Sequence, residues 1–348
     1  MSLKFRRILL MLMSVLIIGG CGSSAVTSAQ KEMARQIDQL CTEKNFNGAV
    51  LVVNKGQVIL SKGYGLANYE EKTPNSPDTV FRIASLSKQF TAAAILLLEE
   101  RGLLKTDDPL SKYIPDFANG DRIALHHLLT HTSGITDYIS LVDKTGDHAY
   151  APAELIAQIK DKPLLFNPGE KFAYSNSNYA LLGYIIEQVS GMSYGDFMAE
   201  NIIKPLGMEN TGYAPNETLP GRAVGYDNIR DGSKATPMNL TVAYAAGGLE
   251  STVQDLYKWL QALDGTTLLS EKSRNKMFTR HLSNYGYGWM ISHFSEDIMW
   301  HSGSLNGFLS VIYRDTKQDN AIIILCNNYL TNLGMLRDKI NEILKAGE

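Results

Sequence analysis

The stretch RIASLSKQFTAA (residues 82–93) places a serine and a lysine three positions apart at the start of an apolar segment. Residues 86–98 are apolar on nearly every face of a helix, which predicts a central, buried helix that ends at Gly102. At its first turn, free backbone N–H groups and the helix dipole would stabilise negative charge on Ser85. Lys88 would lie on the same face, where burial would favour its neutral form.

Spacing alone leaves an alternative open, in which Ser85 is a helix cap and Lys88 a solvated side chain. The same Ser-x-x-Lys pattern recurs at Ser28 and Ser273, both in polar surroundings. A different serine pattern, GMSYG (191–195), matches a nucleophile elbow, which needs a strand before its serine. Here a periodic helical segment precedes it, so Ser193 is predicted to cap the next helix.

Apolar segments near both chain ends predict strands of an antiparallel sheet. Segments 48–54 and 57–65 flank an Asn-Lys-Gly turn, which is a hairpin signal. Four further segments read as successive strands near the other end: 285–292, 297–303, 307–315 and 320–328. Helical spacing marks the segments 31–43, 179–191, 251–263 and 330–346.

We therefore expect an α+β fold in which the antiparallel sheet comes from both chain ends and is flanked by helices. A mostly helical domain, residues 85–244, would be inserted into an α/β part made of residues 31–84 and 245–348. The stretches 137–150 and 216–240 are predicted to rim the cleft between these parts.

The first twenty residues read as an export signal peptide. A positively charged start precedes an eleven-residue apolar run (8–18), which is too short to span a bilayer comfortably. The Ile-Gly-Gly-Cys21 ending resembles the bacterial lipoprotein box, with ordinary secretion as the alternative. We expect residues 21–30 to form a lipidated tether that anchors the protein, through Cys21, to the outer face of a bacterial cell membrane.

Composition narrows the function further. The 348 residues are 44% hydrophobic, carry a formal net charge of −3 and contain no long basic run, so nucleic acid is not an expected partner.

Cys326 lies in an apolar strand, which favours a buried free thiol over a disulfide with Cys41. His127 and His131 are four residues apart, but no carboxylate lies between them, so we expect structural roles and neither a metal nor a cofactor.

Three short motifs stand in a fixed order along the chain: Ser85-Leu-Ser-Lys88, Tyr174-Ser-Asn176 and His301-Ser-Gly303. Together they resemble the serine β-lactamase and penicillin-binding-protein superfamily. The resemblance is greatest to the class C-related branch, which includes esterases, D-aminopeptidases and D,D-peptidases. It covers nearly all of residues 35–345 and extends to five longer segments: LLTHTSGI (128–135), FNPGEKFAYSNSNYALLGYIIEQVSG (166–191), PLGMENTGY (205–213), AAGGLESTVQDLYKWL (245–260) and HSGSLNGF (301–308).

The resemblance implies a β-lactamase/transpeptidase-like fold and a role for each motif residue. Ser85 matches the nucleophile and Lys88 its basic partner. Tyr174 matches the tyrosine that shares proton transfer, and either it or Lys88 takes the serine proton. Asn176 matches the residue that orients Lys88 and the substrate.

The third motif is implied to line the cleft and to bind substrate. His301, Ser302 and Gly303 fall on the edge strand, and the backbone N–H groups of Ser85 and Ser304 would form the oxyanion hole. Class C β-lactamases and many penicillin-binding proteins have a lysine at the first position. Histidine is largely neutral at pH 7, which weakens the case for carboxylate-bearing β-lactams.

The function expected from this resemblance is an exported serine hydrolase. It would form an acyl-enzyme at Ser85 and cleave peptides, including D-amino-acid-containing cell-wall peptides, or esters. β-Lactams would be covalent ligands of the same serine. The alternatives are a true class C-like β-lactamase and a non-catalytic lipoprotein that senses or scaffolds.

Overall fold

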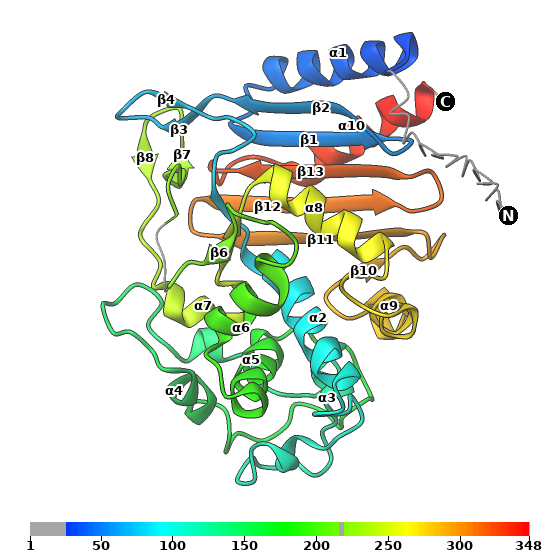
Figure 1. Ribbon diagram of the computed structural model, residues 1–348. Helices are drawn as coiled ribbons and strands as arrows, with labels where there is room; N and C mark the ends of the chain where they lie inside the picture. Colours follow the sequence, from blue (N-terminus) through cyan, green and yellow to red (C-terminus); the bar gives the residue numbers. More distant parts are fainter. Residues whose placement is uncertain (1–25, 216–218, 348) are drawn as a thin grey trace, which may run out of the picture.

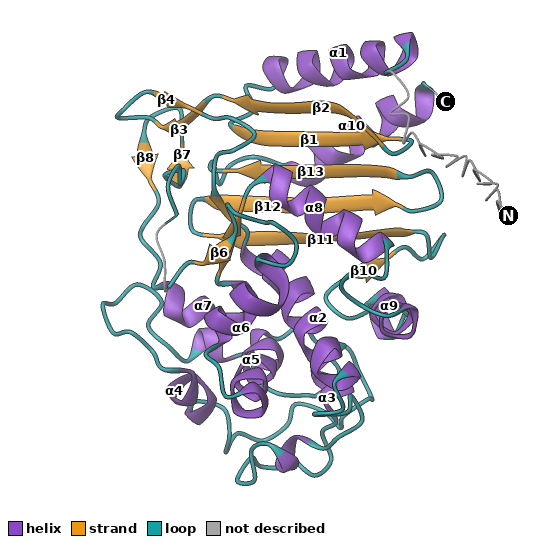
Figure 2. Ribbon diagram, in the orientation of Figure 1, coloured by secondary structure: helices purple, strands orange, loops and turns teal. Residues whose placement is uncertain are grey.

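The computed structural model describes residues 26–215 and 219–347. Its main element is a six-stranded antiparallel sheet in the order β10-β11-β12-β13-β1-β2 (Figures 1 and 2). The strands are β1 (Gly48–Asn54), β2 (Gln57–Tyr64), β10 (Met290–Ile291), β11 (Ile298–Leu305), β12 (Phe308–Asp315) and β13 (Asn320–Cys326).

The two chain ends meet inside this sheet, because β1 pairs with β13. Val50 lies opposite Ile324 in that pair, so strands from the first and last parts of the chain are direct neighbours. This arrangement confirms the predicted fold class, with one antiparallel sheet built from both ends of the chain.

Alternation along the strands gives each sheet face its own apolar layer. Val50 and Ile324 point to one face, where they pack with helices α1 (Ser28–Glu43) and α10 (Leu333–Ala346). Leu51 and Ile323 point to the other face and join the larger core with α2 (Ser87–Glu100) and α8 (Val253–Asp264). The central strands β1 and β13 are thus buried on both sides.

Helix α2 (Ser87–Glu100) is the centre of the larger core. Every residue from Ser87 to Leu98 is buried, as the apolar run predicts. Helix α8 (Val253–Asp264) joins it to the sheet, and the ring of Trp259 stacks on Phe90 with a centroid distance of 4.0 Å.

Below the sheet in Figure 1, helices α5 (Asn176–Ser190) and α7 (Leu240–Gly247) pack against α2. Shorter helices complete this layer: α3 (Leu125–Leu129), α4 (Pro152–Ala157), α6 (Tyr194–Met198) and α9 (Glu271–Phe278). Three small sheets connect the layers: β3 (Leu66–Asn68) with β4 (Thr73–Pro74); β5 (Phe81–Arg82), β9 (Leu249–Ser251) and β6 (Gly212–Tyr213); and β7 (Tyr226–Asn228) with β8 (Ser233–Lys234).

Several boundaries differ from the sequence expectation. Helix α1 begins at Ser28, so the last three residues assigned to the tether are helical. Only Met290 and Ile291 of the predicted strand 285–292 pair in the sheet, because Gly288, with φ of +78°, turns the chain before them. The boundaries of the inserted domain, 84/85 and 244/245, stay a prediction.

Other local expectations are confirmed. Cys41 and Cys326 are buried free thiols. Ser193 caps α6, and its side chain accepts a hydrogen bond from the backbone N–H of Asp196.

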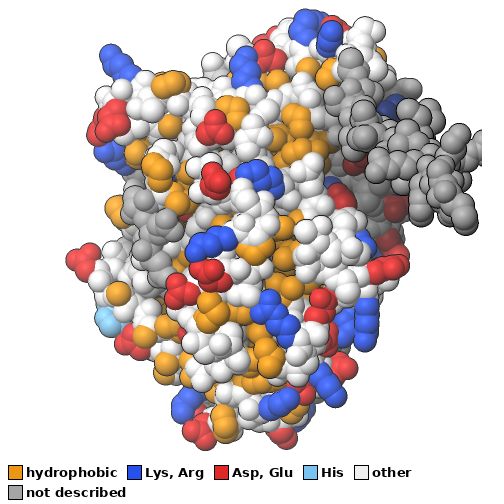
Figure 3. Space-filling view, in the orientation of Figure 1, with side chains coloured by type: hydrophobic (Ala, Val, Ile, Leu, Met, Phe, Trp, Pro, Cys, Tyr) orange, Lys and Arg blue, Asp and Glu red, His pale blue; other side chains and the backbone are white. Residues whose placement is uncertain are grey.

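On the face of the molecule in Figure 3, acidic and basic side chains are interspersed. Within residues 26–215 and 219–347, no helix is both long and apolar enough to cross a membrane.

Candidate active site

Ser85 lies in a tight turn rather than in the helix itself. The turn is a 3₁₀ segment, Ala84–Leu86, and α2 begins only at Ser87, so the predicted position in the first helical turn is wrong by two residues. Ala84 adopts a left-handed backbone conformation with φ of +51°. Such strain in a non-glycine residue persists only where the surroundings enforce it.

Polar contacts hold this turn against the sheet. The Ser310 hydroxyl on β12 donates to the carbonyl of Ile83 at 2.7 Å, and the Ser87 hydroxyl donates to the carbonyl of Ala84 at 2.7 Å. Gly303 on β11 approaches so closely that a Cβ atom there would lie 2.4 Å from the Ile83 carbonyl oxygen. Only glycine fits at this position of the third motif.

Lys88 is completely buried beneath Ser85. Its Nζ atom lies 3.1 Å from Ser85 Oγ, 2.9 Å from Asn176 Oδ1 and 2.8 Å from the carbonyl oxygen of Ala246. Burial lowers the pKa of Lys88 to about 7, and the Asp137 carboxylate opposes that shift. A neutral amine in this position donates to two of these acceptors and keeps a lone pair for the serine proton.

Tyr174 covers the same pair from the cleft side. Lys88 Nζ lies 4.8 Å from the centroid of its ring. The side chain is 40% exposed to the cleft, yet desolvation still raises its pKa, so the hydroxyl holds its proton at neutral pH. Behind it, the buried His131 ring lies 4.2 Å away, centroid to centroid.

Asn176 begins α5 and is oriented by Asp137. One carboxylate oxygen of Asp137 accepts from the Asn176 side-chain amide at 2.8 Å and from its backbone N–H at 3.1 Å. This contact turns the amide oxygen of Asn176 toward Lys88. Asp137 was missed in the sequence because a single acid in a loop carries no recognisable spacing.

His301 is buried on β11 and held in one tautomer. Its Nδ1 lies 2.7 Å from the carbonyl oxygen of Ser302, so Nδ1 donates, and Nε2 accepts from the Tyr285 hydroxyl at 3.1 Å. Burial, reinforced by the charge of Lys88, lowers the pKa of His301 to about 3. His301 therefore presents no positive charge at neutral pH. Tyr285 is a second contact that the sequence did not reveal.

A cleft opens over these residues in two adjoining lobes. The larger cavity, about 710 Å³, is lined by Ser85, Tyr174, the third-motif residues His301, Ser302 and Gly303, and the adjacent Ser304. The smaller, about 220 Å³, shares Ser85, Tyr174 and Ser304 and adds Asn176. Lys144 and Met238, from the stretches predicted to rim the cleft, line this second lobe. The three motifs thus meet at one opening.

The other candidate residues from the sequence lie outside this catalytic cluster or have structural roles. Lys276 pairs with Glu99 at 2.8 Å, so the third Ser-x-x-Lys match lies in a structural ion pair. His127 accepts from the backbone N–H of Ala124 within α3, whereas His131 follows the end of that helix with φ of +56° and cannot share its face. The part of the chain that the structure describes holds no group of three His, Cys, Asp or Glu side chains suited to a metal. Cys21 lies outside the described residues.

Comparisons with known proteins agree with this geometry. The chain is 38% identical over 317 residues to PbpX of Bacillus subtilis (strain 168), whose name marks it as a candidate penicillin-binding protein; the match covers 89% of this chain and 78% of that one. An octameric penicillin-binding protein homologue from Pyrococcus abyssi superposes with a TM-score of 0.79 at 30% identity, over 90% of this chain and 77% of that one.

A D-amino acid amidase from Ochrobactrum anthropi SV3 superposes with a TM-score of 0.78 at 25% identity, over 93% of this chain and 99% of that one. The profile of the Beta-lactamase family matches residues 33–346, which is nearly the whole described chain. The protein therefore belongs to the beta-lactamase family.

Proposed function

We propose that this protein is a serine hydrolase that cleaves peptide or ester bonds through an acyl-enzyme on Ser85. The observation that carries the proposal is the fully buried Lys88, whose Nζ lies 3.1 Å from Ser85 Oγ and whose pKa is lowered to about 7. A structural lysine would be expected to form an ion pair, but the three oxygens to which Lys88 Nζ is hydrogen-bonded are all neutral.

In the first step Ser85 Oγ attacks the substrate carbonyl carbon while its proton passes to the neutral amine of Lys88. The carbonyl π electrons move to oxygen, which would face the backbone N–H groups of Ser85 and Ser304. Collapse of the tetrahedral adduct breaks the bond to the amine or alcohol, which leaves with a proton from Tyr174 or Lys88. Water then releases the acyl group by the same steps in reverse order.

The neutral His301 supports a peptidase or esterase of the class C-related branch rather than an efficient β-lactamase. A cation at this position would attract a substrate carboxylate, and the tautomer fixed by Ser302 and Tyr285 supplies none. D-Amino-acid-containing peptides, such as cell-wall fragments, are the proposed natural substrates; the structural likeness to a D-amino acid amidase supports this choice.

The proposed location is the outer face of a bacterial membrane, with the lipidated Cys21 as anchor. Radiolabelled palmitate incorporated into the wild type but not into a Cys21→Ala variant would support the anchor. Equal labelling of both proteins would exclude it.

A substrate panel tests the activity directly. Wild type and Ser85→Ala are compared on p-nitrophenyl esters, D-aminoacyl amides, D-Ala-D-Ala peptides and nitrocefin, with a fluorophosphonate or labelled β-lactam to trap the acyl-enzyme. We expect turnover of an ester or D-amide, slow or no nitrocefin turnover, and labelling of the wild type only. Labelling of neither protein, or of both equally, would show that Ser85 is not the nucleophile, and rapid nitrocefin turnover would identify a β-lactamase.

A further inference from the structure

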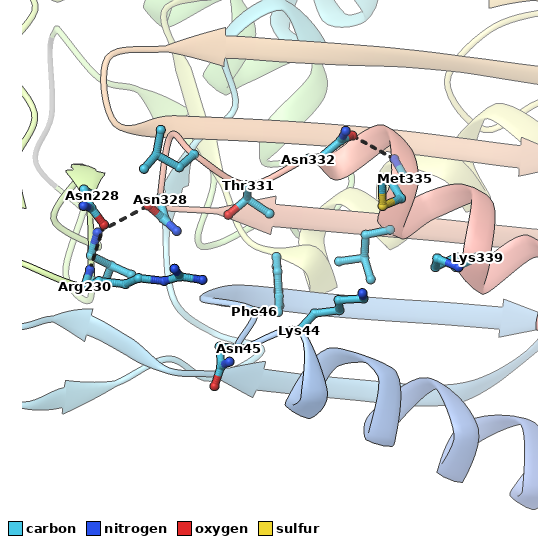
Figure 4. Close-up of a pocket in the computed structure, with 13 residues that line it drawn as sticks. Lys44, Asn45, Phe46, Asn228, Arg230, Asn328, Thr331, Asn332, Met335 and Lys339 are labelled. Atoms are coloured by element: carbon cyan, nitrogen blue, oxygen red, sulfur yellow. Dashed lines mark hydrogen bonds between the residues drawn. The ribbon is translucent and has the colours of Figure 1, made fainter.

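A second cavity, of about 390 Å³, lies outside the catalytic cleft (Figure 4). It is enclosed by the C-terminal end of α1, the turn between β7 and β8, the segment 328–332 and the first turns of α10. Its volume falls in the range of about 300–1,000 Å³ that is typical of small-molecule sites.

All the charge that lines this cavity is positive. Lys44 follows α1, Arg230 lies in the β7–β8 turn and Lys339 lies on α10, so three separate elements each contribute one cation. No carboxylate lines the cavity, and none of the three cations is ion-paired within the part of the chain that the structure describes. Like charges gathered around one space repel, and an anion bound there would relieve that repulsion.

The same cavity has an apolar side. Phe46 and Leu336 form a buried floor, and Leu330 and Met335 stand at the opening with 70% and 51% of their surface exposed. In Figure 4 the Arg230 and Lys44 side chains extend beside Phe46, while Met335 faces the cavity from α10. A ligand with one charged end and one apolar end would match both features.

We propose that this cavity binds an organic anion, a carboxylate or a phosphate ester, that carries a short apolar chain. The anionic group would lie among Lys44, Arg230 and Lys339, and the chain would cover Phe46, Leu330 and Met335. The site is distinct from the proposed hydrolase reaction. It shares a wall with the cleft, because Leu330, Thr331 and Asn332 line both cavities.

Calorimetric titration of the protein with hexanoate and hexyl phosphate tests the proposal. We expect at least one of the two to bind at a single site, and hexanol and inorganic phosphate to bind at least about tenfold more weakly, because each lacks one half of the ligand. The tighter of the two hexyl anions identifies the preferred head group. Equal affinity for hexanol, or no binding of either anion, would overturn the proposal.

Charge-neutralising variants locate the ligand. Arg230→Gln and Lys339→Gln should each weaken binding about fivefold. Lys272→Gln, on an exposed face of α9 outside the cavity, makes the same change of charge and should leave the affinity unaltered. Ser85→Ala should bind as the wild type does. Equal losses in Arg230→Gln and Lys272→Gln, or loss of binding in Ser85→Ala, would place the ligand elsewhere and refute the site; circular dichroism melts confirm folding of each variant.

Discussion

Lys88 offers a test of the site that needs no substrate. Its pKa is about 7 in the folded protein, because the side chain is fully buried, and about 10.4 in an unfolded chain. Between these values the unfolded chain binds more protons than the folded one, so the free energy of unfolding rises with pH. Integrated from pH 7 to pH 9, this one lysine contributes a rise of roughly 2 kcal/mol.

The perturbation is Lys88→Met, which keeps an unbranched side chain but removes the titrating amine. The variant should lose that pH-dependent rise. Its absolute stability also changes, because Asn176 Oδ1 and the Ala246 carbonyl lose their donor, but that loss is nearly independent of pH. Burial keeps His131 and His301 neutral in both folded proteins between pH 7 and pH 9, so their contributions cancel when the slopes are compared over this range.

The assay is urea unfolding at pH 7, 8 and 9 for wild type, Lys88→Met and Ser85→Ala. The last variant keeps the lysine and should retain the rise in unfolding free energy. If Lys88→Met shows the same rise as the wild type, Lys88 is not the group whose proton affinity changes on folding. The argument that it serves Ser85 as a neutral base would then fail.

Three further predictions concern neighbouring residues. Asp137→Asn removes the carboxylate that favours protonated Lys88, so the pH midpoint of acylation, measured with a fluorophosphonate, should fall by about one pH unit; an unchanged or higher midpoint would contradict this. His301→Lys should speed acylation by carboxylate-bearing β-lactams relative to a neutral ester, and an equal or slower rate would count against the charge argument. Ser193→Ala should lower stability by about 1 kcal/mol in urea without loss of esterase activity, whereas an inactive but folded variant would restore this serine as a nucleophile candidate.

Much of the fold could be predicted because the decisive signals are local. The hairpin 48–64, the apolar run of α2 and the stop at Gly191 each depend on a few adjacent residues, and each is confirmed. The strand predicted at 285–292 was wrong over most of its length, because its aromatic residues face the core from a bent loop. In residues 285–292, a buried loop has the same apolar pattern as a strand that pairs in a sheet.

The motif residues of the site could be found because spacing and order carry their signal. Their supporting contacts could not be found in this way. Asp137 and Tyr285 each act through a partner distant in the sequence, Asn176 and His301 respectively. The carbonyl of Ala246, which accepts from Lys88, belongs to the backbone, so the type of amino acid at this position does not indicate the contact. Such contacts become visible only when the chain is folded.

The pairing of β1 with β13 has a consequence for how the molecule is made. Val50 finds its partner Ile324 only after nearly the whole chain is available, so the centre of the sheet closes last during synthesis. Until then β1 has a free edge toward the missing β13, and its apolar side chains lack their neighbours. A chain that stops before β13 should aggregate rather than fold in part, which makes its last thirty or so residues as decisive for solubility as its core.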